Sequence, residues 1–145
     1  MRRLLFVLPL LVACGTAETP PADEPATAMP GLTEADVAGT WTGTAMLAGT
    51  DSIVSHWTQE CANGTCRLTS QEMPDTVVST YYIAADSVVG STGAFTDPAA
   101  GGATVTDHWV VRVTSGQLNG TGMLKLADNP DSVVVRYTLT GSKNP

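Results

Sequence analysis

Positive charge is scarce in this chain of 145 residues. Lysine and arginine together number 7, against 14 aspartate and glutamate residues, and there are only 2 histidines. A nucleic-acid-binding surface is basic, so this composition argues against a nucleic-acid partner. An acidic surface favours solubility and cationic partners.

The sequence motifs of common enzyme families are also missing. There is no Gly-x-Ser-x-Gly turn, no His-Glu-x-x-His pair, no phosphate-binding loop and no dinucleotide fingerprint. No Asp-x-Asp-x-Asp loop is present that would indicate calcium. We therefore expect a protein that is not an enzyme and that holds no cofactor or metal.

No apolar run is long enough to span a membrane. The apolar run at residues 4–11 follows Arg2 and Arg3, and at about ten residues it is half of what a spanning helix needs. A basic start, a short apolar stretch and a small residue at position 13 are typical of a secretory signal. We predict that residues 1–13 are a signal peptide.

The segment Leu11-Val12-Ala13-Cys14 resembles the lipobox of bacterial lipoproteins. That resemblance implies that Cys14 is lipidated and becomes the first residue, so that the bilayer is a partner through its acyl chains. Gly15 stands where an aspartate would indicate retention at the inner membrane. The expected location is the bacterial cell envelope, at the outer membrane facing the periplasm or the cell surface. The alternative is an ordinary secretory signal with a chance cysteine.

Residues 14–31 are rich in proline, alanine and acidic side chains and contain almost no large apolar ones. Such a segment cannot bury enough surface to offset its conformational entropy. We predict a flexible tether, followed by a single domain at residues 32–145.

Only two cysteines, Cys61 and Cys66, remain once Cys14 is assigned to lipid, and Asn63-Gly64 between them is a tight-turn signal. Exported proteins retain disulfides, so we predict a disulfide across a hairpin. The alternative is a zinc site that adds His56, which the four-residue spacing and the oxidising compartment disfavour.

Alternating β-branched residues and closely spaced turn signals dominate the domain. Short links require antiparallel neighbours, so we predict an all-β domain, an up-and-down antiparallel β-barrel. A β-sandwich is the alternative. The eight expected strands cover residues 39–48, 52–61, 65–71, 76–84, 87–95, 104–114, 117–127 and 132–141.

A capped helical turn at residues 32–37, followed by Gly39-Thr40-Trp41, is similar to the start of lipocalins and avidin-like proteins, the calycin barrels. In lipocalins this tryptophan packs at the closed end against a basic residue of the last strand. The resemblance implies that Arg136 packs on Trp41.

Two His-Trp pairs, His56-Trp57 and His108-Trp109, indicate which side chains face inward, because neighbouring residues of a strand point to opposite faces. Tryptophan is the better core residue, so both histidines are expected at the surface. The inward rows would then be residues 41, 43, 45 and 47; 53, 55, 57 and 59; 105, 107, 109, 111 and 113; 118, 120, 122, 124 and 126; and 133, 135, 137 and 139.

Several of these inward positions are polar or aromatic and suggest a ligand pocket. A membrane-anchored barrel that binds a small apolar or aromatic ligand would have a cavity of several hundred Å³. An alternative is that the polar side chains lie wetted at the rim and that the protein is an interaction or structural module, for example an assembly factor or an inhibitor of a cationic protein. The candidate pocket residues are Ser55, Trp57, Gln59, Tyr81 (or Tyr82), Asp107 and Trp109.

Overall fold

The structure is a computed structural model that describes residues 31–145. The predicted signal peptide, Cys14 and all but the last residue of the tether lie outside the described residues. No helix in residues 31–145 has the length and apolar character needed to cross a membrane. The elements in chain order are α1 (Glu34–Val37), β1 (Gly39–Leu47), β2 (Ile53–Ala62), β3 (Thr65–Ser70), β4 (Val77–Ala84), β5 (Ser87–Thr92), β6 (Phe95–Asp97), the 3₁₀ turn η1 (Pro98–Ala100), β7 (Ala103–Thr114), β8 (Gln117–Leu126) and β9 (Val133–Lys143).

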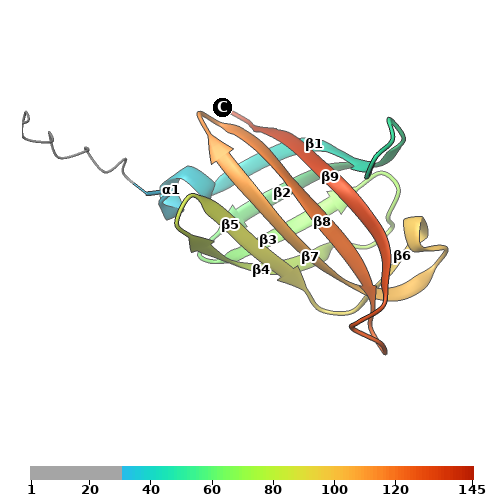
Figure 1. The fold of residues 1–145 in the computed structure, drawn as a ribbon. Coiled ribbons are helices and arrows are strands. Elements are labelled where there is room, and N and C mark those ends of the chain that lie inside the picture. The colour runs from blue at the N-terminus through green and yellow to red at the C-terminus, as the bar shows by residue number, and fades with distance from the viewer. Residues whose placement is uncertain (1–30) are drawn as a thin grey trace, which may run out of the picture.

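The strands form a closed antiparallel barrel, which confirms the predicted fold class (Figure 1). Eight strands follow one another around the wall, and pairing of β5 with β7 closes the ring. The short β6 pairs with the first residues of β7, beyond the point where β5 ends. The expected strand at residues 87–95 is therefore divided into β5 and β6.

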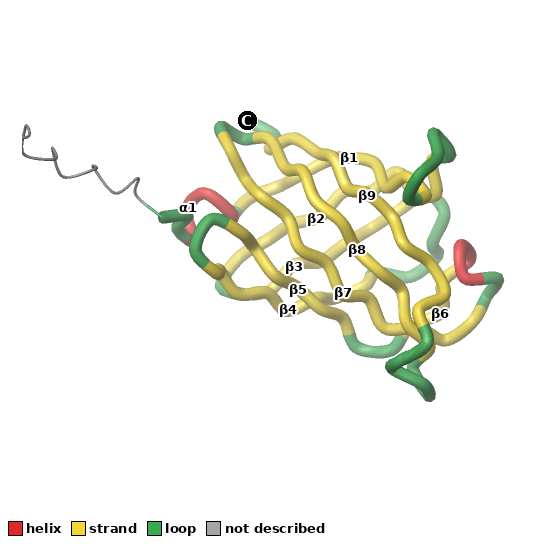
Figure 2. The backbone as a smooth tube through the Cα atoms, in the orientation of Figure 1, coloured by secondary structure: helices red, strands yellow, loops and turns green. Residues whose placement is uncertain are grey.

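The two ends of the barrel differ (Figure 2). Helix α1 and tight turns lie at one end, the closed end. The longer connections, residues 48–52, 71–76, 93–102 and 127–132, gather at the opposite end. We call this opposite end the mouth.

Inward and outward side chains alternate largely as expected. Trp41, Trp57, Trp109 and Tyr137 are buried, whereas both histidines lie at the surface. The buried core that contains these aromatic residues also includes Ala45, Cys61, Cys66, Tyr81, Val88, Val105, Val111, Leu118, Leu124 and Val135.

The inward row of β2 needs one correction at its start. Ile53 was expected inside but is 51% exposed. The register shifts between Ala45 and Met46, so that Ala45 faces Ser55 while Met46 faces Ile53. This irregularity inserts Val54 as an extra residue and reverses the alternation before it. Leu47, also expected inside, is 38% exposed at the rim of the mouth.

The predicted disulfide joins Cys61 and Cys66, which lie directly opposite each other in β2 and β3. Asn63 and Gly64 form the connecting turn, with φ angles of 51° and 75°. Positive φ at both positions is typical of the turn that Asn-Gly favours in two-residue hairpins. Both cysteines are buried, so the bridge also contributes to the core.

Helix α1 covers the closed end and is held there by hydrogen bonds. The Trp41 indole donates to the Val37 carbonyl at 2.8 Å. The Glu34 carboxylate accepts from the Asn63 backbone N–H at 2.8 Å and from the Tyr81 hydroxyl. Helix α1 is thus held by hydrogen bonds to β1, β4 and the β2–β3 turn.

The basic residue beside Trp41 is Lys143 and not Arg136. The Lys143 ammonium lies 5.7 Å from the centre of the Trp41 ring and donates to the carbonyls of Ala35 and Asp36 at 3.0 and 3.2 Å. Arg136 faces Met123 near the mouth. The correction follows from the register of β9, which places position 143 opposite position 41.

Candidate ligand pocket in the barrel

A cavity of about 100 Å³ lies inside the barrel and extends toward the mouth. It is far smaller than the several hundred Å³ that the ligand-binding hypothesis predicted. Its wall is largely apolar, with Ala45, Val77, Val111, Leu118, Leu124, Val135 and Leu139 between the aromatic rings of Trp57, Phe95, Trp109 and Tyr137.

Aromatic side chains reduce the cavity because glycines on neighbouring strands make room for them. Trp109 faces Gly90 across β5 and β7, and Tyr137 faces Gly122 across β8 and β9. A Cβ at Gly90 would overlap the Trp109 ring, and one at Gly122 would overlap the Tyr137 ring. The interior is therefore mostly filled by aromatic rings packed over glycines, and the cavity described above is the space that they leave.

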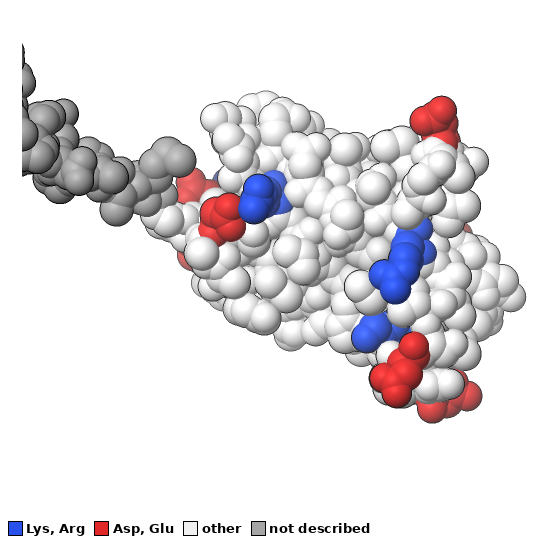
Figure 3. Space-filling model, in the orientation of Figure 1, with Lys and Arg blue, Asp and Glu red and all other residues white. Residues whose placement is uncertain are grey.

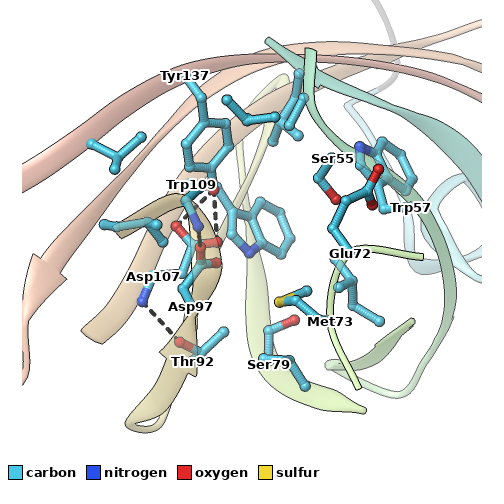
Figure 4. Close-up of a pocket in the computed structure, with 18 of the residues that line it drawn as sticks. Ser55, Trp57, Glu72, Met73, Ser79, Thr92, Asp97, Asp107, Trp109 and Tyr137 are labelled. Carbon is cyan, nitrogen blue, oxygen red and sulfur yellow. Dashed lines mark hydrogen bonds between the residues drawn. The ribbon is translucent and has the colours of Figure 1, made fainter. Parts of the chain in front are cut away.

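Asp107 and Tyr137 form the polar pair of the cavity (Figure 4). The Tyr137 hydroxyl donates to both carboxylate oxygens of Asp107, at 2.6 Å each. The Asp107 backbone N–H donates to the Thr92 hydroxyl at 2.8 Å, which fixes β7 against the end of β5. The carboxyl group is thus positioned from both its side chain and its backbone.

Burial raises the pKa of the Asp107 carboxyl to about 7, and the nearby negative charge of Asp97 raises it further. The hydrogen bonds from Tyr137 and from the His108 backbone lower the same pKa but do not compensate for burial. Burial also raises the pKa of the Tyr137 hydroxyl, well above its ordinary value. Near neutral pH the Asp107 carboxyl group therefore gains or loses its proton, while the Tyr137 hydroxyl stays protonated.

Two further carboxylates lie at the mouth. Asp97 ends β6 and accepts from the backbone N–H of Ala99 at 2.7 Å. Glu72, in the β3–β4 loop, accepts from the Ser70 hydroxyl and lies 3.0 Å from Nδ1 of His56. These hydrogen bonds lower the pKa of Glu72 to about 2.

The Glu72, Ser70 and His56 cluster does not have the geometry of a catalytic triad. Glu72 contacts both of the other residues, whereas a triad requires the histidine to contact the hydroxyl nucleophile. The hydrogen bonds of Glu72 to His56 instead hold the β3–β4 loop against β2. In residues 31–145 no three histidine, cysteine or acidic side chains come close enough to hold a metal ion.

Trp57 carries an unsatisfied polar group. The side chain is 5% exposed, and its indole nitrogen is buried without a hydrogen-bond partner in the described part of the chain. It lies across the cavity from Asp107 and Trp109 (Figure 4). A buried donor left without an acceptor costs about 1–3 kcal/mol, so this N–H lowers the stability of the folded protein.

Most of the candidate pocket residues line the cavity, but neither of the two candidate tyrosines does. Tyr81 is buried at the closed end, where it contacts Glu34, and Tyr82 is 63% exposed on the outer wall. Neither lines the cavity. The candidates that do line it are Ser55, Trp57, Gln59, Asp107 and Trp109.

The sequence-based candidates omitted Tyr137, Asp97 and Glu72. Tyr137 was expected to face inward, but its contact with Asp107 depends on the relative register of β7, β8 and β9. Asp97 and Glu72 lie outside the regular alternation, one in a three-residue strand and one in a loop. No periodic signal in the sequence could have placed them at the mouth.

Comparison with known proteins identifies no relative. No protein family, no curated protein and no solved structure matches this chain. Any functional inference therefore depends on the residues themselves.

Proposed function

We propose that this barrel binds a small apolar or aromatic molecule in its interior and performs no catalysis. The observation that carries the proposal is the cavity that extends to the mouth between Trp57 and Trp109 and contains the Asp107–Tyr137 pair. Ligand sites commonly combine a mainly apolar wall with a few positioned polar groups, and this cavity has that composition.

The volume limits the ligand. An engineered cavity of about 150 Å³ in another protein holds benzene, and this cavity is smaller, at about 100 Å³, so a ligand can place at most one ring inside it. The rest of such a ligand would project toward the mouth. The polar residues found there would then contact its substituent.

Binding can be tested with one-ring compounds such as benzyl alcohol, using isothermal titration calorimetry and tryptophan fluorescence. Trp57 and Trp109 both line the cavity, so we expect their emission to change on saturation. The variant Ala45→Leu places a larger side chain in the cavity wall and should abolish binding. The matched control is Ala84→Leu, on the outside of β4, which should bind normally. Absence of binding by the unmodified protein up to roughly 10 mM, which corresponds to a binding free energy of only about −2.7 kcal/mol, would refute the proposal.

We also propose that the protein is a lipoprotein of the bacterial cell envelope, held at the outer membrane through Cys14. The support is the sequence Leu11-Val12-Ala13-Cys14 behind a short apolar run. The expected result is incorporation of a fatty-acid label in the unmodified chain and none in Cys14→Ser, with the protein fractionating with membranes only when it is labelled. Labelling of the serine variant would contradict the anchor.

A second candidate is an interaction module, favoured by an apolar patch on the outer wall. Tyr82, Val89 and Val110 lie side by side across β4, β5 and β7, and Tyr82 and Val110 are 63% and 46% exposed. On the face shown in Figure 3, charged side chains gather at the two ends of the barrel and leave the middle of the wall uncharged. Loss of a co-purifying envelope protein in Tyr82→Ser, with ligand binding intact, would favour this function.

A further inference from the structure

The cavity and its mouth carry charge of one sign. Three carboxyl groups line them, those of Glu72, Asp97 and Asp107, and the lining contains no lysine, arginine or histidine. An anionic ligand would find no positive partner here. A cationic ligand would find up to three negative ones.

The three carboxylates are not equivalent. Glu72 is engaged by Ser70 and His56, and Asp97 is engaged by the Ala99 backbone N–H. Asp107 receives the Tyr137 hydroxyl but forms no ion pair with any residue of the described chain. Its carboxylate oxygens retain acceptor capacity, because an ionised carboxylate has about four acceptor sites.

An unpaired carboxylate in a mainly apolar cavity is costly unless a positive charge joins it. Aromatic rings near such a group also attract cations through their π faces, and Trp109 and Phe95 line the same space as Asp107. Trp57 on the opposite wall adds a second indole ring to the same space. Each of these observations concerns a separate side chain.

We infer that the ligand is a small organic cation, an amine whose ammonium group faces Asp107 and Asp97 while its apolar body lies between Trp57 and Trp109. This inference rests on the proposed ligand-binding function and specifies its chemical class. Asp107 and Tyr137 determine the position of the ammonium group, and Asp97 adds negative charge on the side of the mouth. The site should discriminate against carboxylates of the same shape.

The test uses three probes that share one ring and differ in charge: benzylamine, benzyl alcohol and benzoate. Their dissociation constants are measured by calorimetry on the full protein at about pH 8. We expect benzylamine to bind at least about tenfold more tightly than benzyl alcohol, a difference of about 1.4 kcal/mol. Benzoate should bind more weakly than benzyl alcohol.

Asp107→Asn removes the charge and keeps an oxygen that can accept from Tyr137. We expect this variant to bind benzylamine and benzyl alcohol equally, within about threefold. Asp51→Asn is the matched control, since Asp51 is an exposed residue of the β1–β2 turn at the same end and does not line the cavity. It should retain the preference for benzylamine.

A pH titration of the unmodified protein gives a second measurement that needs no variant. The groups that face Asp107 are Tyr137 on β9 and Asp97 on β6, with Glu72 across the mouth. Because the pKa of Asp107 is raised to about 7, benzylamine affinity should fall as the pH drops from about 8 to about 6, while benzyl alcohol affinity stays constant.

The outcomes separate the inference from the function on which it rests. Equal binding of benzylamine and benzyl alcohol by the unmodified protein would overturn the amine specificity and leave ligand binding intact. If none of the three probes binds, the proposed function itself fails. If Asp51→Asn loses the preference as fully as Asp107→Asn, the preference reflects overall negative charge and the assignment to Asp107 is wrong.

Discussion

At the scale of single residues, the interior is determined by which glycine lies beside which aromatic side chain. Trp109 occupies the space over Gly90, and Tyr137 occupies the space over Gly122. Because Tyr137 is placed in this way, its hydroxyl reaches Asp107. The glycines therefore position the polar pair of the cavity as well as the core.

The variant Gly90→Ala tests this packing. Its new methyl group would overlap the Trp109 ring, and overpacking of this kind typically costs about 1–3 kcal/mol. We expect the free energy of unfolding, measured by urea denaturation, to fall by that amount. The control is Gly93→Ala, where nothing lies within 4 Å of the added atom; a loss of equal size there would mean that overlap with the Trp109 ring is not the cause.

Asp107 predicts a pH-dependent stability. Its pKa is raised from 3.8 to about 7 in the folded protein, so the folded state holds a proton that the unfolded chain releases. This contribution to stability is complete below about pH 4 and is lost as the pH rises through about 7. The protein should therefore become less stable between about pH 5 and pH 8, by about 2–3 kcal/mol from this group.

Comparison with Asp107→Asn isolates that contribution, because every other titrating group is common to both proteins. Urea denaturation at the two pH values should show the variant gaining about 2–3 kcal/mol relative to the unmodified protein as the pH rises. A difference between the two proteins that does not change with pH would show that the carboxyl group titrates normally.

At the scale of elements, the closed end depends on α1, a helix of a single turn. Glu34 links it to the β2–β3 turn and to β4 by accepting from Asn63 and Tyr81. The Tyr81 pKa is raised to about 12, first by burial and then by its hydrogen bond to Glu34. The helix is too short to be stable alone, so these contacts hold it in place.

Glu34→Ala should therefore destabilise the protein by about 1–3 kcal/mol, because Tyr81 and Asn63 each lose an acceptor. Hydrogen exchange should accelerate in residues 33–41 and remain unchanged in β7 and β8. Glu60→Ala, on the exposed side of β2, removes the same side chain without these contacts and should have little effect. Unchanged exchange in α1 would show that Trp41 and Lys143 suffice to hold it.

The sequence predicted elements better than it predicted their contacts. Alternation and turn chemistry located the strands and the disulfide, because these signals depend on near neighbours. The exposure of Ile53 depends on a register irregularity between β1 and β2, and the choice of Lys143 over Arg136 depends on how β9 aligns with β1. These registers join residues far apart in the sequence, so the periodic pattern of the sequence does not predict them.

The candidate site was predictable to a similar extent. Alternation placed Trp57, Asp107 and Trp109 inside, and all three line the cavity. The volume was overestimated, because the fit of each ring over a glycine depends on cross-strand pairing. Asp97 and Glu72 come from irregular segments whose direction no pattern determines.

At the scale of the whole molecule, the cavity and the start of the described chain lie at opposite ends. Gly31 precedes α1 and lies near the Ala85 carbonyl in the β4–β5 turn at the closed end, whereas Asp97, Pro98 and Ala99 line the cavity at the mouth. A chain tethered through residues that precede position 31 would be attached at its closed end. This arrangement leaves the mouth free to face the aqueous side of a membrane.

This geometry makes a prediction about the proposed anchored form. Lipidated protein in vesicles should bind benzylamine with the same dissociation constant, within about twofold, as the unlipidated Cys14→Ser protein in solution, because the described chain begins at the closed end, opposite the mouth. Lipids with brominated acyl chains, which quench tryptophans in contact with the bilayer, should leave the emission of Trp57 and Trp109 unchanged. Weaker binding in vesicles together with quenching would indicate that the mouth faces the bilayer, and the ligand would then be expected to enter from the lipid phase.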